Sequence, residues 1–397
     1  MSPAGRSDFI IAGGGIGGLV AALCLARANR TVRVLEQAPE FGEIGAGLQL
    51  APNAARILDW LGVLDRVMKD AFFPARLVLR DALSGAEVTA LRTGNAFQNR
   101  YNFPYFVTHR ADLHAALMEA GELDARIELL PGKKVVGFDQ EADLVHVACA
   151  DGTRFSASAL IGADGIRSHI RSELIGDGEP VPTGYVAYRG TVPVQAVRDA
   201  TGITELTDMV IWMGPAMHLV QYPVRGGDLC NLVAVFQSRR FQEGASAWGT
   251  PEELDEVFAQ AHGPVRDAAR LMNRERSWPM FDRPPTAGWS RGNVTLLGDA
   301  AHPMFQYLAQ GACQAMEDAV VLAQSLSSHA GVREALRSYE AMRYPRASIV
   351  QTRARMFGDL IHAGGAMAAL RNRFLGYRSD LDYSDTDWLY DHAVLRQ

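Results

Sequence analysis

The sequence predicts an α/β (α+β) protein in which a Rossmann-like three-layer domain is joined to an antiparallel-sheet domain and a helical C-terminal part. Three observations support this prediction. A glycine pattern follows the first apolar run, hydrophobicity alternates with a period of two from 184 to about 240, and the segment from Leu336 to about Phe374 has helical periodicity. With 397 residues, the chain has the length of two or three domains.

The N-terminal segment carries the pattern G-x-G-x-x-G between a strand-like run and a helix. A helix over Leu19–Arg27 and a second strand over Thr31–Leu35 complete a βαβ unit, which Glu36 closes. The glycines permit a tight turn, close approach of a pyrophosphate and close helix packing, while the helix N-terminus attracts the anion and the acid accepts hydrogen bonds from ribose hydroxyls. A dinucleotide site is therefore predicted. The pattern residues are Gly13, Gly15, Ile16 and Gly18.

The following segment is predicted to leave the nucleotide-binding fold for a short excursion. Glu43–Asn53 is a glycine-broken loop, suited to lie against a flat cofactor, and it leads into a helix over Ala54–Leu61. Arg76–Arg80 and Glu87–Leu91 alternate around Ser84-Gly85, which predicts a β-hairpin in another sheet.

The chain then returns to the first domain. Tyr105–His109 has the pattern of a strand and Asp112–Ala120 that of a helix. Leu144–Ala148 begins a hairpin, and a buried run over 159–162 ends in the turn Asp164-Gly165.

Period-two alternation marks the second domain. A single covering helix is predicted over Pro251–Ala269. A last buried strand, Val294–Leu297, precedes Gly298-Asp299 and a helix over Ala312–Ser327 that belong to the first domain again. The four strands predicted in the second domain are Gly184–Val194, Met209–Met213, Met217–Val224 and Leu229–Gln237.

The domains are consequently predicted to be discontinuous. The nucleotide-binding domain takes 1–75, 101–180 and 288–345, and the substrate-binding domain takes 76–100 and 181–287. The C-terminal helical segment takes 346–397.

Composition excludes several classes of protein. A net charge of −6 gives no basic excess, so nucleic acid is not an expected partner. The four cysteines stand far apart, so neither disulfides nor a metal site is predicted, and His109, Asp112 and His114 are interpreted as surface or packing residues. The N-terminus enters a strand directly, so no signal peptide or membrane span is expected and a cytoplasmic location is the default.

Three signals in a fixed order carry a family resemblance: the glycine fingerprint, Asp164-Gly165 and Gly298-Asp299. Together they resemble the FAD-dependent aromatic hydroxylases of the para-hydroxybenzoate hydroxylase type. The resemblance implies FAD as cofactor, NADH or NADPH as co-substrate, O2 as oxidant, a C4a-hydroperoxyflavin and a homodimer. Besides the fingerprint and Glu36, it implies these FAD-binding residues: Gly47, Leu48, Arg110, Val136, Asp164, Asp299, Gly311 and Ala312.

A narrower resemblance concerns the substrate. Pro104–His114, Met217–Pro223 and His302–Gly311 are similar to 3-hydroxybenzoate 6-hydroxylases, which form gentisate. Gln306 stands where many relatives have proline, and its amide both donates and accepts hydrogen bonds. The resemblance therefore implies a small aromatic hydroxy acid as substrate and a side-chain contact from Gln306 to its hydroxyl.

A strand of period two places His218, Val220 and Tyr222 on one face. If this face covers the flavin, His218 is a candidate base, because a phenol becomes a better nucleophile as its hydroxyl loses a proton and imidazole titrates near pH 6.5. We thus predict His218 and Gln306 as catalytic residues. Tyr105 and Tyr222 are candidates to hold the substrate carboxylate or stack on the ring, with core packing as the alternative.

Other functions stay open at this point. The same fold and cofactor serve salicylate and 6-hydroxynicotinate hydroxylation. A flavin oxidase or dehydrogenase that inserts no oxygen, or a non-catalytic FAD-binding protein, would share the cofactor signals. The preference between NADH and NADPH is not readable from the sequence.

Overall fold

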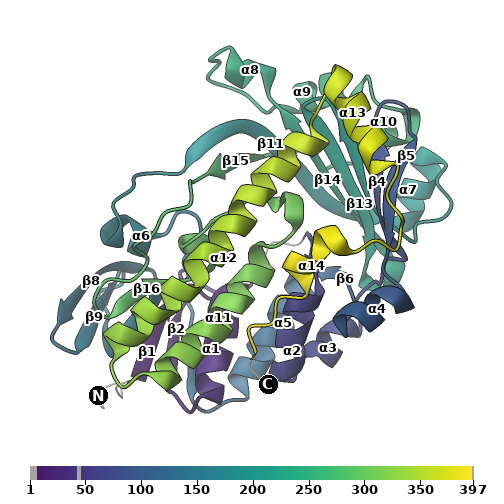
Figure 1. The fold of residues 1–397 in the computed structure, drawn as a ribbon. Coiled ribbons are helices and arrows are strands. Elements are labelled where there is room, and N and C mark those ends of the chain that lie inside the picture. Colours follow the sequence, from purple (N-terminus) through teal and green to yellow (C-terminus); the bar gives the residue numbers. More distant parts are fainter. Residues whose placement is uncertain (1–6, 43–45, 396–397) are drawn as a thin grey trace.

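The computed structural model describes residues 7–42 and 46–395, and two large sheets organise them (Figure 1). In the first sheet the order is β7-β2-β1-β10-β9-β8, with β16 also paired to β10. The strands from β7 to β10 run parallel, as does β16, whereas β9 and β8 extend the sheet as an antiparallel hairpin. The strands are β1 (Ser7–Ala12), β2 (Val32–Leu35), β7 (Ile127–Leu130), β8 (Val135–Glu141), β9 (Leu144–Cys149), β10 (Arg154–Gly162) and β16 (Val294–Leu296).

Helices pack on the first sheet around a single hydrophobic core. The central helix α1 (Ile16–Arg27) contacts both α5 (Arg110–Glu122) and α11 (Gly311–Ser328), and α11 in turn contacts α2 (Pro52–Leu61). Helix α2 ends at Gly62, whose positive φ of 77° closes the last turn. The short helices α3 (Leu64–Met68) and α6 (His169–Leu174) complete this part of the molecule.

The second sheet has the order β15-β11-β14-β13-β12-β4-β5. Neighbouring strands are antiparallel except β12 and β4, which run parallel, so the sheet predicted as antiparallel contains one parallel pair. The hairpin predicted outside the nucleotide-binding fold forms its edge. The strands are β4 (Arg76–Asp81), β5 (Glu87–Arg92), β11 (Val181–Pro193), β12 (Met209–Gly214), β13 (Met217–Val224), β14 (Leu229–Gln237) and β15 (Trp278–Asp282).

One helix prediction in this region is wrong. The pattern over Pro251–Ala269 forms two helices, α9 (Pro251–Phe258) and α10 (Gly263–Arg270), instead of one. Pro264 cannot continue a preceding helix, because it lacks the amide hydrogen, but it fits the first turn of a new one. With α7 (Val194–Thr201) these helices pack into the hydrophobic core of the second sheet.

A two-stranded ribbon joins the two parts. Strand β3 (Gly47–Leu50) lies inside the segment that was predicted as a loop, and it pairs with β6 (Phe106–His109). Strand β6 in turn contacts β13 of the second sheet. The ribbon therefore brings Gly47 and Leu48 toward β13 of the second sheet. Residues 43–45 of the predicted loop lie outside the described residues.

The C-terminal part is helical. Helix α12 (Val332–Ile361) runs alongside α11 and reaches toward the second sheet, where α13 (Gly365–Leu375) contacts β5 (Figure 1). Helix α14 (Ser384–Tyr390) returns to α2. Two further helices are short, α4 (Asn95–Tyr101) and α8 (Arg239–Gln242). Within the described residues, no helix is both long and apolar enough to cross a membrane.

Candidate active site

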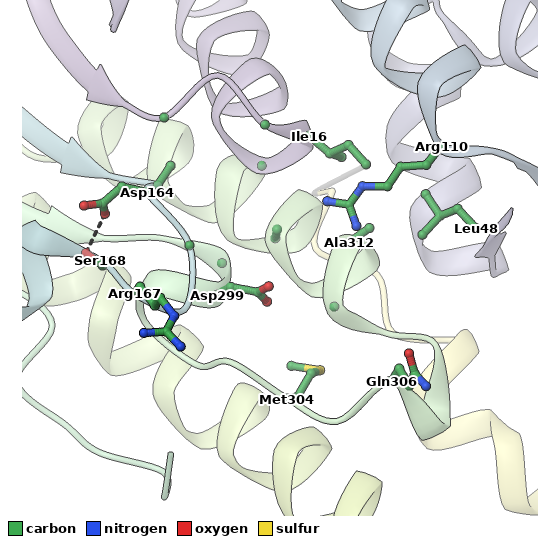
Figure 2. A pocket seen from close by; sticks show the side chains of 18 of the residues that line it. Ile16, Leu48, Arg110, Asp164, Arg167, Ser168, Asp299, Met304, Gln306 and Ala312 are labelled. Carbon is green, nitrogen blue, oxygen red and sulfur yellow. Dashed lines mark hydrogen bonds between the residues drawn. The ribbon is translucent and has the colours of Figure 1, made fainter. Parts of the chain in front are cut away.

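A cavity of about 990 Å³ connects the glycine turn after β1 with one face of β13. Figure 2 shows residues from distant segments around it, including Ile16, Arg110, Asp164 and Asp299. Of the predicted cofactor and substrate residues, all but Gly18 and Tyr105 line this cavity. The lining set is Gly13, Gly15, Ile16, Glu36, Gly47, Leu48, Arg110, Val136, Asp164, His218, Tyr222, Asp299, Gln306, Gly311 and Ala312.

The glycine turn is tightly packed behind the cavity wall. Gly13 has a φ of 112°, and a Cβ at this position would lie 2.3 Å from the carbonyl oxygen of Ala163. A Cβ on Gly18 would lie 2.0 Å from the carbonyl oxygen of Gly13, so Gly18 supports the turn from outside the cavity. Helix α1 starts after Gly15 without a side-chain cap among the described residues. Its first amides are thus available to an anion in the cavity.

Two acidic residues of the nucleotide end accept backbone hydrogen bonds. Glu36 accepts from the amides of Gly14 at 2.7 Å and Ala38 at 2.8 Å. Asp164 accepts from the Ser168 hydroxyl at 2.5 Å (Figure 2). It also accepts from the amide of His169 at 2.8 Å. Burial raises the pKa of Asp164, although these hydrogen bonds oppose the shift. Direct contact of either carboxylate with a nucleotide stays a prediction.

The loop that presents Asp299 is held from behind by Asp318. Asp318 Oδ2 accepts from the amide of Gly298 at 2.9 Å and lies 2.6 Å from His302 Nε2. Arg343 Nε donates to the other carboxylate oxygen at 2.6 Å. Burial acts to raise the pKa of Asp318, but His302 and Arg343 together lower it to about 2. His302 does not line the cavity. Its contact with Asp318 instead orients the loop that carries Asp299.

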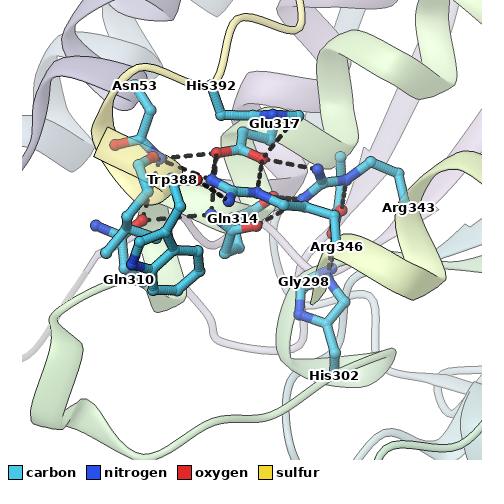
Figure 3. Close-up of polar contacts among 12 residues, drawn as sticks. Asn53, Gly298, His302, Gln310, Gln314, Glu317, Arg343, Arg346, Trp388 and His392 are labelled. Atoms are coloured by element: carbon cyan, nitrogen blue, oxygen red, sulfur yellow. Dashed lines mark hydrogen bonds and ion pairs between the residues drawn. The ribbon is translucent and has the colours of Figure 1, made fainter. Parts of the chain in front are cut away.

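The same buried network extends through Glu317 to the C-terminal tail. Glu317 pairs with Arg343 at 2.7 Å and accepts from Asn53 Nδ2 at 2.8 Å. Arg346 contacts Glu317 at 3.2 Å and also donates to the carbonyl oxygens of Trp388 and Leu389, so residues of α2, α11, α12 and α14 meet in one cluster (Figure 3).

At the opposite end of the cavity, the alternating residues His218, Val220 and Tyr222 of β13 form one wall. Gln306, in the turn η3 (Gln306–Leu308), contributes a buried Nε2 that has no hydrogen-bond partner among the described residues. Asn231, which pairs with Tyr222 across β13 and β14, lies outside the cavity lining, and its Oδ1 accepts from the amide of Gly47 at 2.7 Å. The buried donor of Gln306 without a partner indicates that a polar ligand belongs in this end of the cavity.

His218 has an imidazole neighbour that the sequence did not reveal. Its Nδ1 lies 2.7 Å from Nε2 of His362, and the two rings stack with centroids 5.0 Å apart. Burial lowers the pKa of His218 well below its ordinary value, and His362 lowers it further. Burial likewise lowers the pKa of His362, to about 4. Both rings are therefore neutral near pH 7.

Tyr105 lies behind the cavity wall. Its ring is buried, and its hydroxyl donates to Gln49 Oε1 at 2.5 Å. Gln49 itself lines the cavity. Tyr105 therefore orients a wall residue, and a direct contact with the substrate stays a prediction.

Arg189 of β11 is a cavity residue that sequence reasoning missed. Its guanidinium stacks over Trp278 at 5.2 Å, and its Nε is buried without a partner among the described residues. Burial lowers the pKa of Arg189, and the charge of Arg110 adds to this effect. The alternation of β11 was readable in the sequence, but which face of that strand would meet the cavity was not.

The fold and this cavity define a dinucleotide-binding protein, because an uncapped helix N-terminus, a glycine cradle and carboxylates that follow three strands line one space. The chain belongs to the FAD binding domain family, whose family model matches residues 6–354. The predicted family is thereby confirmed.

The sequence is similar to those of several enzymes over most of its length. It is 39% identical to a 3-hydroxybenzoate 6-hydroxylase of Polaromonas naphthalenivorans, covering 97% of this chain and 96% of the relative. A 3-hydroxybenzoate 6-hydroxylase of Klebsiella oxytoca is 40% identical, with 96% of each covered. A 6-hydroxynicotinate 3-monooxygenase of Bordetella bronchiseptica is 35% identical, covering 87% of this chain and 90% of the relative. These relatives identify the chain as an FAD-dependent aromatic monooxygenase.

Solved structures show the same fold. The structure described as a salicylate hydroxylase substrate complex is 26% identical, with a TM-score of 0.81 over 98% of this chain and 96% of the other. HpxO of Klebsiella pneumoniae, complexed with FAD and uric acid, is also 26% identical and has a TM-score of 0.81 over 94% and 93% of the two chains.

Proposed function

We propose that this enzyme hydroxylates a phenolic aromatic acid with NADH or NADPH as electron donor and O2 as oxidant, and that it converts 3-hydroxybenzoate to gentisate. One observation carries the proposal: a single cavity joins the glycine turn to a wall where His218 and Gln306 stand together. The names of the relatives at 39% and 40% identity support this substrate. Bound FAD, once reduced by the nicotinamide, would supply activated oxygen to the ring.

The glycine end of the cavity fits the dinucleotide. The amides at the start of α1 would hold the pyrophosphate, and Glu36 and Asp299 would accept from ribose and ribityl hydroxyls. Gly311, at the N-terminus of α11, lies close to Asp299. The amides of this second helix would stabilise negative charge on the reduced ring system.

His218 and Gln306 would act on the substrate hydroxyl. The unpartnered Nε2 of Gln306 donates one hydrogen bond, which orients the hydroxyl. The neutral ring of His218 accepts the phenolic proton, and the resulting phenolate is a stronger carbon nucleophile. The phenol has to lose its proton only while the substrate occupies the cavity. A base such as His218, which is buried in the cavity wall, meets the hydroxyl only in that state.

Arg189 would hold the carboxylate of the substrate. It is the cation next to Tyr222 on the cavity wall, and its buried Nε lacks a partner among the described residues. A carboxylate would provide that partner in a charge-assisted hydrogen bond. A substrate with its hydroxyl at His218 and its carboxylate at Arg189 would thus be fixed at both ends.

Apolar side chains between these groups would keep water from the reacting centre. Ile211, Val220, Val233 and Met304 line the cavity near His218. A dry surrounding limits the side reaction in which reduced flavin and O2 release hydrogen peroxide.

Product analysis tests the proposal. The protein would be supplied with 3-hydroxybenzoate, NADH and ¹⁸O2, with salicylate and 6-hydroxynicotinate in parallel. The proposal requires labelled gentisate and one NADH consumed per product. Labelled product from only one of the other acids would replace the substrate assignment, and unlabelled product would indicate a flavin oxidase or dehydrogenase.

The family resemblance also supports a homodimer, and a cytoplasmic location is the default expected from the widely spaced cysteines. Sedimentation velocity of the FAD-loaded protein would give the mass of the assembly, and cell fractionation would give its location.

A further inference from the structure

The contact between His218 and His362 joins the cavity to the partly exposed C-terminal end of α12. His218 is 1% exposed and lines the cavity, whereas His362 is partly exposed at the end of α12. With Nδ1 of His218 committed to its neighbour, Nε2 is the nitrogen left for a ligand in the cavity.

Several contacts fix the second ring in this position. His362 stacks on Tyr185 with centroids 4.7 Å apart and an angle of 14°, and Tyr307 meets it edge-on at 5.3 Å. The carbonyl oxygen of His362 accepts from the amide of Ala216, in the turn before β13, at 3.0 Å. The helix end and the strand that carries His218 are therefore tied together.

The end of α12 is also held by a buried cation. Arg371 Nη1 donates to the carbonyl oxygens of Leu360 at 3.0 Å and Ile361 at 3.2 Å. Gly358 permits the close approach of Tyr307, because a Cβ there would lie 2.4 Å from the tyrosine ring. These contacts define one orientation of His362 toward the cavity side.

Charged groups around the pair favour departure of a proton outward. Arg371 contributes to the lowered pKa of His362, so a proton is not retained on that ring. The exposed carboxylate of Asp359 acts on both Tyr185 and Tyr307, which contact His362. A cation, Arg371, therefore acts on His362 itself, the carboxylate of Asp359 lies near the two tyrosines that contact it, and the cavity side is neutral at His218.

We propose that His218 and His362 form a two-imidazole relay that carries the phenolic proton of the substrate from the buried cavity to solvent. The relay rests on the proposed function, in which His218 is the base. In the resting tautomer His218 Nδ1–H donates to His362 Nε2. The substrate O–H bond breaks as His218 Nε2–H forms, the Nδ1 proton passes to His362 Nε2, and His362 Nδ1 releases its proton to water.

This route removes the main energetic problem of a buried base. A charged imidazolium at His218 would be desolvated, and burial disfavours the charged form. Transfer along the pair moves the charge to a ring that solvent reaches. The reverse passage returns a proton to the product hydroxyl and restores the first tautomer. His362 is therefore a positioning and relay residue, and His218 is the group that touches the substrate.

Two substitutions at His362 test the relay kinetically. In His362→Gln, kcat for hydroxylation should fall about 10²-fold or more, within the range of proton-transfer effects, while the substrate Kd and FAD content stay within twofold. In His362→Ala, added imidazole should restore activity by filling the vacated space, and it should have no effect on the wild type. His329→Gln, at the far end of α11, is the matched control. Unchanged kcat in His362→Gln would overturn the relay.

A readout independent of turnover separates this inference from the proposed function. Nitrogen-15 NMR of labelled histidines in the FAD-loaded protein reports which ring nitrogen carries the proton. The relay requires His218 at pH 7 to be protonated at Nδ1 and bare at Nε2, with this signal altered in His362→Gln. Protonation of His218 at Nε2 would overturn the relay whatever the substrate. A wild type with this tautomer but no hydroxylation of any phenolic acid would overturn the proposed function instead.

Discussion

Arg343 Nε and Asp318 Oδ1 form an ion pair 2.6 Å long in which neither side chain is more than 2% exposed. The pair joins α12 to α11, and the same carboxylate holds the amide of Gly298 beside the cavity. One buried carboxylate therefore links the packing of α11 and α12 to the loop that carries Asp299.

Removal of the cation should destabilise the protein strongly. Arg343→Ala leaves Glu317 and Asp318 buried without the cation that they share, which costs about 3–5 kcal/mol in comparable cases. Urea unfolding of the FAD-loaded protein measures the loss. Arg92→Ala breaks the exposed pair with Asp380 and should cost less than about 1 kcal/mol. Equal losses in the two variants would contradict this assignment.

Acid should weaken the fold through Asp318. Its pKa is about 2 in the folded protein, against an ordinary value of 3.8. A depressed pKa stabilises the fold above pH 4, and this contribution of about 2 kcal/mol disappears as the pH falls from about 4 to 2. Asp318→Asn should be less stable at pH 7 and should show a shallower loss of stability in that window. Parallel pH profiles for variant and wild type would exclude Asp318 as the source.

His218→Ala should separate chemistry from binding. We expect FAD to be retained and kcat for hydroxylation to fall about 10²–10⁴-fold, as for loss of a general base, with a smaller change in substrate Kd. Stopped-flow spectra and product analysis give these quantities. Turnover equal to that of the wild type would remove His218 from the mechanism.

Arg189→Gln should weaken binding of acids selectively. Loss of a hydrogen bond between charged groups costs about 1.5–3 kcal/mol, so the Kd for 3-hydroxybenzoate should rise about tenfold or more. The neutral analogue 3-hydroxybenzyl alcohol should bind equally to variant and wild type. Arg276 also stacks over Trp278, at 5.3 Å, but is exposed outside the cavity, so Arg276→Gln is the control. An equal effect on both ligands would disprove a carboxylate contact.

Gly47→Ala should disturb the substrate end of the cavity. A Cβ would lie 2.5 Å from the ring of Tyr222 and 2.7 Å from Asn231 Cγ, so both side chains must move. We expect a raised KM and more hydrogen peroxide released per NADH. Gly42→Ala, where a Cβ meets nothing within 4 Å, should behave as the wild type. A normal KM for Gly47→Ala would show that the wall adapts without cost.

The sequence predicted the fold class and family, and both are confirmed. Alternation along β13 also placed His218 and Tyr222 on one face, because strand periodicity is local information. Local patterns did not reveal the break at Pro264 or strand β3. The limits of the domains and the roles of the site residues stay predictions.

Partners distant in sequence were beyond the reach of such patterns. His362 lies 144 residues from His218, and only the packing of α12 against the second sheet brings them together. Tyr105 illustrates the opposite case, because it lies behind the cavity wall and its hydroxyl contacts the wall residue Gln49 instead of the cavity. Side-chain direction there depends on tertiary structure.

Strand β16 pairs with β10 across more than a hundred intervening residues. During synthesis, the flavin-binding sheet therefore stays incomplete until Leu296 has left the ribosome, and the end of β10 from Leu160 to Gly162 stays without its β16 partner while the second sheet is made. Such late, non-local closure makes folding slow and leaves an unpaired strand open to aggregation. Expression yield in cells should accordingly depend on chaperone supply more than on the stability of the finished enzyme.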